Sequence, residues 1–280
     1  MTRSDPGIRR ILVALDASAD SAAALEAAVA LAARLEAELT GLFVEDIEIV
    51  RAAGLPYARE IRVFQRAPHT VDAAELEAQL RARARAIERT LAHSAGEADV
   101  RSRFRRVRGR VDAEVLAATG DVDLVVLGRA GHSPLARRRL GSTARAMLAR
   151  GSRPLLLLGS QVRLREPVFA VFDGSEAGTR ALAVALDIAG RGPQPLHVLV
   201  TALSAERAGA LEAEVRRSLG SVATKVVVHR LVGADHARLA EIACGWGAGV
   251  LVVPASDPTL DAAALPDALD AAGCPLLLVR

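Results

Sequence analysis

Three glycines and two hydroxyl residues follow an apolar segment with a spacing that suits an anion. After Leu124–Leu127 the sequence reads Gly128-Arg129-Ala130-Gly131, and nine residues later it reads Gly141-Ser142-Thr143. Glycine carries no Cβ, so backbone N–H groups beside it can approach an anion closely. Ser142 and Thr143 begin a segment, 144–149, that is typical of a helix, and the free N–H groups at a helix N-terminus favour phosphate. The spacing therefore predicts a phosphate-binding loop.

Apolar segments that alternate with helical ones must position this loop. Strand-sized apolar segments occur at 11–15, 42–44, 122–127 and 154–158. A helix expected between the first two, over 21–39, would turn inward a face made of Leu25, Val29, Ala32 and Leu35. Short strands that alternate with helices predict a parallel sheet covered on both faces. The glycines follow the carboxyl end of such a strand, where open α/β sheets bind ligands.

The chain repeats its own pattern. Residues 11–18 read ILVALDAS and residues 168–175 read VFAVFDGS, each an apolar strand that ends in Asp, one small residue and Ser. Residues 153–158 and 274–279 also match, as RPLLLL and CPLLLV. We therefore predict an α/β fold of two repeated Rossmann-like domains, each a five-stranded parallel-sheet α/β/α sandwich. The domains would span residues 1–160 and 161–280.

The two halves differ in length. The offset between them is 157 from Asp16 to Asp173 but 121 from Pro154 to Pro275, so the second half is shorter by 36 residues. We place most of the excess in residues 45–71, because loops absorb insertions at small cost. This segment is either a decorated surface loop or a lid over a ligand.

Composition excludes several classes of protein. Hydrophobic residues make up 51% and charged residues 25% of the 280 residues, which predicts a packed core and excludes wholesale disorder. Apolar runs are far shorter than the roughly 18 residues of a membrane span, and the polar start is unlike a secretory signal. We therefore expect a cytoplasmic protein without membrane insertion. The net charge of +3 permits a polyanion, but aromatic residues are 2%, so we expect no nucleic-acid partner.

Charged and reactive side chains elsewhere have structural interpretations. Residues 100–110 hold six arginines, which is typical of a charged outer strand, with a nucleic-acid patch as the alternative. Arginines and glutamates over 75–89 predict a salt-bridged, exposed helix. The histidines outside the glycine loop show no metal-ligand spacing. Cys244 and Trp246 are expected in the core, and Arg137–Arg139 within the loop is interpreted as a solvated face.

On these motifs the chain resembles a tandem universal stress protein, with two such domains fused. The resemblance covers nearly the whole chain and rests on the Asp-ended first strand, the G-x2-G-x9-G-[ST] loop and the closing Pro-apolar strands, 154–158 and 275–279. It implies binding of ATP, or of AMP or ADP, together with Mg²⁺, whose ligands stay unknown. Closing strands commonly pair in that family, so we expect an internal pseudo-dimer and leave a further homodimer open.

Site residues of the family carry over by position. The resemblance implies that Asp16 meets the ribose or a phosphate-bound metal, and that the backbone of Val44 contacts adenine. Ala14 and Leu15 would flank the base. The implied nucleotide-binding residues are Ala14, Leu15, Asp16, Val44, Gly128, Arg129, Gly131, Gly141, Ser142 and Thr143.

The second half departs from this pattern. Pro254-Ala255-Ser256-Asp257 replaces the first glycines, and Leu265-Pro266-Asp267 stands near the place of Gly-Ser. Carboxylates in these segments and at Asp261 would repel phosphate. We therefore predict no nucleotide there, and we expect Asp173 to be a helix N-cap or a turn residue.

Three classes of function follow from this pattern. The preferred one is a stress-response regulatory protein that binds an adenine nucleotide in its first half, is recognised by an unknown protein partner and is not an enzyme. A slow ATPase is the alternative, weakened because the phosphate loop has no obvious general base aimed at a water; Asp16 is the one nearby candidate. A scaffold whose two pockets are both empty is the third.

Overall fold

The structure is a computed structural model that describes residues 7–53, 59–60, 69–70, 73–130, 140–190, 193–219, 225–234, 236–255 and 273–280. The elements of the first half are β1 (Arg10–Ala14), α1 (Ala19–Leu35), β2 (Glu38–Asp46), α2 (Ile47–Ala53), β3 (Arg59–Glu60), β4 (His69–Thr70), α3 (Ala73–Glu97), β5 (Ser102–Gly109), α4 (Val111–Ala117), the 3-10 helix η1 (Ala118–Asp121), β6 (Leu124–Gly128), α5 (Ser142–Arg150) and β7 (Leu155–Leu158). Those of the second half are β8 (Val168–Phe172), α6 (Glu176–Ala189), β9 (Leu196–Ala202), α7 (Ala205–Leu219), β10 (Val226–Val232), α8 (His236–Gly245), β11 (Val250–Pro254) and β12 (Leu276–Val279).

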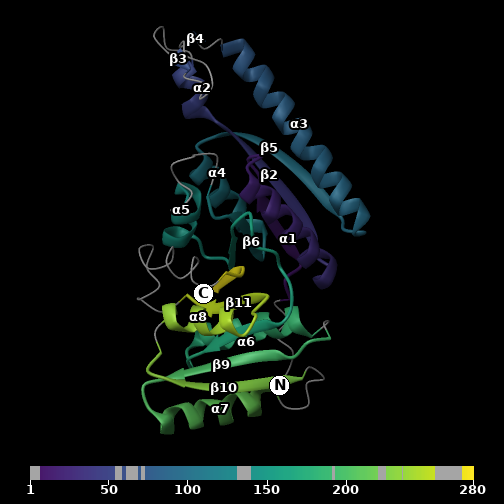
Figure 1. Cartoon of the computed structure of the whole chain (residues 1–280). Coiled ribbons are helices and arrows are strands. Elements are labelled where there is room, and N and C mark those ends of the chain that lie inside the picture. The colour runs from purple at the N-terminus through teal and green to yellow at the C-terminus, as the bar shows by residue number, and fades with distance from the viewer. Residues whose placement is uncertain are drawn as a thin grey trace.

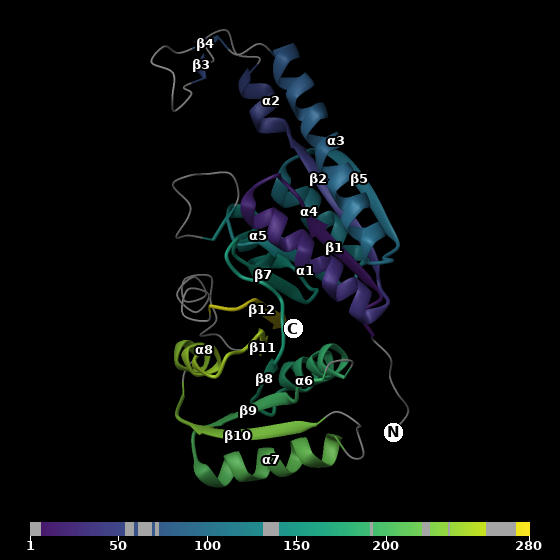
Figure 2. The same ribbon diagram turned by 45° about the vertical axis from the view of Figure 1, so that its right-hand side comes forward.

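One ten-stranded sheet runs through both halves, in the order β10-β9-β8-β11-β12-β7-β6-β1-β2-β5 (Figure 1). Neighbouring strands within each half are parallel. Between the halves, β12 lies beside β7 (Figure 2). The two strands pair antiparallel, with Leu277 opposite Leu156. The prediction of two repeated five-stranded parallel sheets that form an internal pseudo-dimer is confirmed. The division at residue 160, between β7 and β8, stays a prediction.

Alternation along the strands divides the core into two layers. In β1, Ile11 and Val13 face the layer covered by α1, α3, α6 and α7, whereas Leu12 faces the layer covered by α4, α5 and α8. The central strands are apolar throughout because both of their faces are covered, and every residue of β7 is buried. Among the described helices, none is long and apolar enough to cross a membrane.

Helix α1 ends earlier than its apolar periodicity indicates. The expected end at Leu39 is wrong, because the helix stops at Leu35 and Glu36 takes the left-handed conformation, with φ of 54°. Leu39 then lies in β2, opposite Ile11. This C-cap is usually a glycine or an asparagine, so a glutamate in the same role leaves no signal in the sequence.

The first half carries its extra residues beyond the end of β2. Helix α2 and the β3–β4 hairpin lie past the sheet, and the long helix α3 returns beside β5 (Figure 1, Figure 2). Residues 54–58, 61–68 and 71–72 of this segment lie outside the described part. The charged strand is β5, at one edge of the sheet, as predicted. On α3 the expected ion pairs include Arg81 with Glu77 at 3.4 Å.

An aromatic cluster that spacing alone did not predict lies in the second half. The Nδ1 atom of His197 is 3.0 Å from Nε2 of His229, and the Phe169 ring stacks on His197 with centroids 4.5 Å apart. Trp246, just beyond α8, packs its ring at a tilt against His229 and is half exposed. Cys244 is also exposed. The expected core placement of these two residues is therefore wrong, because both lie at the surface, where Trp246 contacts the rings of Phe169 and His229.

The joint between the two sheets gives a first prediction. Leu277 is 0% exposed, whereas Leu203 is 96% exposed. We expect Leu277→Ala to lower the free energy of unfolding by about 2–5 kcal/mol, because the cavity it leaves cannot collapse fully. The matched change Leu203→Ala should stay within about 0.5 kcal/mol. Urea unfolding measures both, and equal effects would contradict the described burial of Leu277 at this joint.

The histidine pair gives a prediction on pH. Burial lowers the pKa of both His197 and His229. The unfolded state therefore binds more protons at these histidines than the folded state does. The contribution of the pair to the free energy of unfolding is complete above the ordinary pKa of 6.5 and is lost as the pH falls below it. We expect unfolding free energies measured at about pH 7.5 and 5.5 to decline toward acid. The decline should be smaller in His229→Gln, and an unchanged decline would count against the pair.

Candidate functional site

A cavity of about 590 Å³ lies at the carboxyl ends of β1, β2 and β6. Strand β1 has β2 on one side and β6 on the other, so the order of the strands reverses at β1. Open α/β sheets bind ligands at such a point. A larger hollow of about 1050 Å³ lies at the amino ends of the strands and is lined mainly by charged residues such as Arg9 and Asp123. We take the smaller cavity as the candidate site because of its place in the topology.

Most of the sequence-predicted residues meet around this cavity. Its lining includes Ala14, Leu15, Asp16, Val44, Gly128, Gly141, Ser142 and Thr143. Gly131 lies outside the described residues, as do His132 and Arg137–Arg139. Arg129 is described but is not part of the lining. Its Nε is buried beside Gly159, 3.9 Å from the position that a Cβ on that glycine would take.

The turn after β1 places Asp16 at the rim. The carboxylate of Asp16 accepts a hydrogen bond from the Ser18 N–H at 2.9 Å, and Ser18 in turn caps α1 by accepting from the N–H of Ser21 at 3.1 Å. Ala17 between them has φ of 66°. Because one carboxylate oxygen is bonded within the turn, the Asp16 side chain is held at the cavity rather than left to rotate.

The backbone of Val44 extends past the end of β1. The carbonyl of Leu42 accepts from the Leu15 N–H at 2.9 Å, so Leu42 turns its backbone groups toward β1. Backbone groups alternate between the two neighbours along a strand, and Val44, two residues on, therefore points the same way. Paired residues of β1 end at Ala14. A donor and an acceptor of Val44 consequently face the cavity, where a planar base edge could pair with both.

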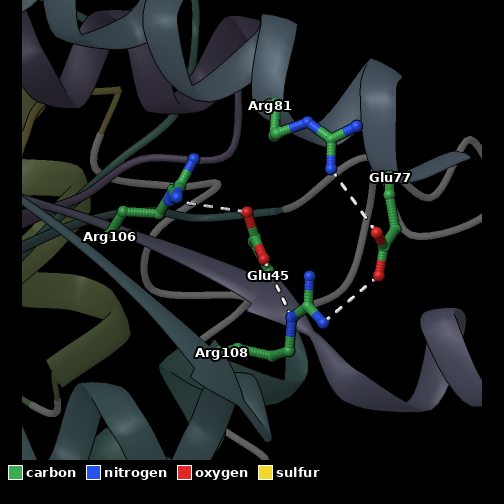
Figure 3. Close-up of polar contacts among 5 residues, drawn as sticks. All are labelled: Glu45, Glu77, Arg81, Arg106 and Arg108. Atoms are coloured by element: carbon green, nitrogen blue, oxygen red, sulfur yellow. Dashed lines mark hydrogen bonds and ion pairs between the residues drawn. The ribbon is translucent and has the colours of Figure 1, made fainter. Parts of the chain in front are cut away.

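An ion-pair network holds this end of β2 from the opposite face (Figure 3). Glu45, 5% exposed, pairs with Arg108 at 3.0 Å and with Arg106 at 3.6 Å. Arg108 also pairs with Glu77 of α3 at 3.3 Å. The hydrogen bond from Arg108 to Glu45, reinforced by the charge of that carboxylate, raises the pKa of Arg108. The network joins β2, β5 and α3, and so fixes the wall that contains Val44.

Helix α5 presents unused N–H groups at the other end of the cavity. Intrahelical bonding begins with Arg145, whose N–H donates to Gly141, and Gly141 itself donates to the Arg129 carbonyl at 2.9 Å. Within the described part of the chain, no hydrogen bond takes the N–H of Ser142, Thr143 or Ala144. These three donors and the helix dipole favour an anion at this position.

Asp20 of α1 organises the strand ends beside the cavity, which spacing alone did not predict. Its carboxylate accepts from the N–H of Ala130 and from that of Ser160, both at 2.8 Å. Close packing of α1 also explains Gly128, because a Cβ there would lie 2.8 Å from the Asp20 backbone. Gly128 is therefore required for packing, and its N–H need not meet a ligand.

Helix α2, which has no counterpart between β9 and α7, and helix α3, the counterpart of α7, add a wall to the cavity. Ile49 of α2 and Leu80 and Arg83 of α3 are part of the lining, with Asp46 at the end of β2 and Arg145 on α5. Residues 45–71 were expected to be either a decorated surface loop or a lid over a ligand, and Ile49, which belongs to that segment, is part of the lining. Arg83 was missed because it was counted among the exposed charges of its helix, although it lies three residues after buried Leu80.

The corresponding turn of the second half serves its own helix. Asp173 accepts from both the N–H and the hydroxyl of Ser175, at 2.9 and 2.7 Å, and Ser175 is the N-cap of α6. Asp173 is thus a turn residue, one of the two expected roles, and the cap is Ser175. Strand β11 ends at Pro254, where β6 has Gly128, and the segments with Asp257, Asp261 and Asp267 lie outside the described residues.

Comparisons with known proteins agree with this geometry. The model of the Universal stress protein family matches residues 7–159, more than half of the chain, and does not extend into the second half. No curated protein sequence matches.

Solved structures share the fold over nearly the whole chain. A universal stress protein from Archaeoglobus fulgidus DSM 4304 is 16% identical with a TM-score of 0.74, covering 97% of this chain and 98% of its own. A functionally unknown protein from Pseudomonas aeruginosa PAO1 is 17% identical with a TM-score of 0.54, covering 97% and 92%. The cytoplasmic domain of a prokaryotic cation chloride cotransporter is 13% identical with a TM-score of 0.56, covering 97% and 95%. At these identities the likeness concerns the fold.

The double role of Asp20 gives a prediction. Asparagine has one acceptor oxygen where aspartate has two, so Asp20→Asn should leave the N–H of Ala130 or of Ser160 without a partner. We expect a loss of about 1–3 kcal/mol in unfolding free energy and faster hydrogen exchange at one of these amides. Glu26→Gln on the same helix breaks the exposed pair with Arg163 and should cost less than about 1 kcal/mol. Equal costs in the two variants would contradict the assigned role.

Proposed function

The chain belongs to the universal stress protein family, and we propose that it binds one adenine nucleotide, ATP with Mg²⁺, in the cavity of its first half. The observation that carries the proposal is that one cavity has the backbone donor and acceptor of Val44 at one end and the unused N–H groups of α5 at the other. A volume of about 590 Å³ is within the range of small-molecule sites. In this proposal the protein is a stress-response regulator, and a partner protein recognises its nucleotide-bound state.

The two ends of the cavity would bind different parts of the nucleotide. Adenine offers a donor and an acceptor along one edge, which match the acceptor and donor of Val44, with Ala14 and Leu15 beside the ring. The phosphates would accept hydrogen bonds from the backbone N–H groups of Ser142 and Thr143. Such hydrogen bonds are stronger when the acceptor is charged. Arg83 and Arg145 add positive charge to the lining.

The residues present fit a magnesium ion that arrives with the phosphates. Mg²⁺ is usually held by one or two carboxylates together with phosphate oxygens and water, and Asp16 supplies such a carboxylate at the rim. Within the described residues, no three His, Cys, Asp or Glu side chains gather to hold a metal ion by themselves. The ion would therefore bind together with the nucleotide, and it would screen the negative charge of the phosphates from that of Asp16.

The proposal assigns no catalytic role to the chain. Hydrolysis would need a general base aimed at a water beside the terminal phosphate. Asp16 is the candidate, and it accepts from the Ser18 N–H while it would also face the metal. The second half is proposed to bind no nucleotide, because Pro254 stands where a glycine would be and the loop sequence carries carboxylates.

Calorimetric titration with Mg-ATP, Mg-ADP and AMP tests the proposal. We expect one site per chain, and Ser142→Pro should weaken Mg-ATP about tenfold or more, since it removes one N–H from a charged acceptor. Proline is tolerated at the first position of a helix, and Gly141 before it has φ of −60° and ψ of 157°, which proline permits. The fold should thus survive, which circular dichroism would verify.

A matched variant separates the backbone donor from the hydroxyl. Ser142→Ala keeps the N–H and should bind Mg-ATP nearly as well as the unsubstituted chain. Failure of the unsubstituted chain to bind any of the three nucleotides would overturn the proposal. Two sites per chain would overturn the account of the second half, and phosphate release well above that of Ser142→Pro would favour the slow ATPase.

A further inference from the structure

Arg280, which follows β12 in the second half, reaches the C-terminal end of α5 in the first half. Its guanidinium donates to the backbone carbonyls of Leu148 and Gly151, and through Nη2 to that of Met147 at 3.4 Å. The last carbonyls of a helix lack partners within the helix. One side chain of the second half therefore completes the hydrogen bonding of a helix in the first half, as basic residues near helix ends can do.

Two further contacts hold Arg280 at this position. The backbone before it is fixed by the antiparallel pairing of β12 with β7. Its own carbonyl oxygen accepts from Nε of Arg180 on α6 at 2.5 Å, and Arg180 also pairs with Glu176 one turn earlier. Burial lowers the pKa of the Arg280 guanidinium, but arginine stays charged under ordinary conditions. The cap is thus a fixed positive charge.

The two ends of α5 face different halves of the molecule. Its C-terminal carbonyls meet Arg280, and its N-terminal N–H groups at Ser142 and Thr143 line the candidate cavity. The helix is nine residues long, from Ser142 to Arg150, so both ends belong to one short rigid element. A cation at the C-terminus stabilises the helix dipole and restrains the helix that offers its opposite end to an anion.

We propose that Arg280 is a positioning residue through which the second half fixes α5 and sets the affinity of the first half for its nucleotide. The inference rests on the proposed function and deepens it, because it gives the half without a phosphate loop a role in the same site. Arg280 touches no ligand in this account. It acts by holding the three N–H donors of α5 at the cavity before the nucleotide arrives, which removes part of the ordering cost of binding.

The pseudo-symmetry of the chain is broken at this contact. The offset of 121 that relates Pro154 to Pro275 also relates Gly159 to Arg280. The first half thus has no side chain at the position from which the second half caps α5.

Arg280→Met tests the inference, since methionine keeps an unbranched side chain and removes every donor. We expect its Mg-ATP dissociation constant to rise about fivefold, which corresponds to the free energy that a partly buried charge contributes at a helix end. In the nucleotide-free protein, hydrogen exchange of residues 142–151 should accelerate while exchange of β6 and β1 stays unchanged. Arg280→Lys, which restores the charge and some of the donors, should recover part of both losses.

A matched control carries the same substitution on a similar contact elsewhere. Arg153 donates to the carbonyls of Thr119 at 3.3 Å and Gly120 at 3.1 Å, at η1 rather than at α5. Arg153→Met should lower the unfolding temperature and leave the dissociation constant and the exchange of α5 unchanged.

Three outcomes decide the matter. An unchanged Mg-ATP affinity in Arg280→Met, with normal binding by the unsubstituted chain, overturns the inference alone. An equal loss in Arg153→Met also overturns it, because the effect would then be one of general stability. Absence of nucleotide binding by the unsubstituted chain overturns the proposed function and the affinity claim together, and the exchange of α5 in the nucleotide-free protein then reports separately on the cap.

Discussion

Backbone pairing between β12 and β7 is the constraint on which the rest of the molecule depends. Each strand closes a five-stranded parallel sheet and is buried along its whole length, so neither could stand as a free edge without exposing unpaired backbone groups and leucines. Antiparallel pairing satisfies both edges at once and produces one continuous sheet. The remaining edges, β10 and β5, lie at the far ends, and β5 is protected by its arginines.

A repeated architecture built in this way need not keep two equal sites. Both halves retain the Asp turn after the first strand, since Asp16 and Asp173 each accept from the N–H two residues on. This hydrogen bond holds the serine that caps the following helix in either half, so it has a structural use without any ligand. The differences lie elsewhere, in Gly128 against Pro254 and in helix α2, which walls one cavity and has no counterpart between β9 and α7. Architecture is therefore shared, whereas the proposed recognition of an anion depends on features of one half.

Local patterns were sufficient to predict the repeat, the parallel strands and the start of α5, because each depends on neighbours within a few residues. Of the predicted residues that line the cavity, the glycines, Ser142 and Thr143 came from the loop motif, whereas Ala14, Leu15, Asp16 and Val44 came from the family resemblance. Features set by distant segments could not be predicted. The histidine pair, for example, joins β9 to β10. The end of α1 could not be predicted for a local reason, because Glu36 takes a conformation usually given to glycine. Asp20 bonds to Ser160, and Arg280 to the end of α5, across separations of 140 and more than 120 residues. Neither contact leaves a mark in the spacing of residues.

The glycine motif itself divides into two physical roles. Gly128 lacks a side chain because the backbone of α1 passes at contact distance, and the N–H of Gly141 is already bonded to Arg129. These two glycines shape the loop, and the donors left for an anion belong to Ser142, Thr143 and Ala144 on the first turn of α5. Since those donors move with the helix, their position depends on whatever fixes its other end. The site is therefore local in its chemistry, but its geometry is set by the joint between the two halves.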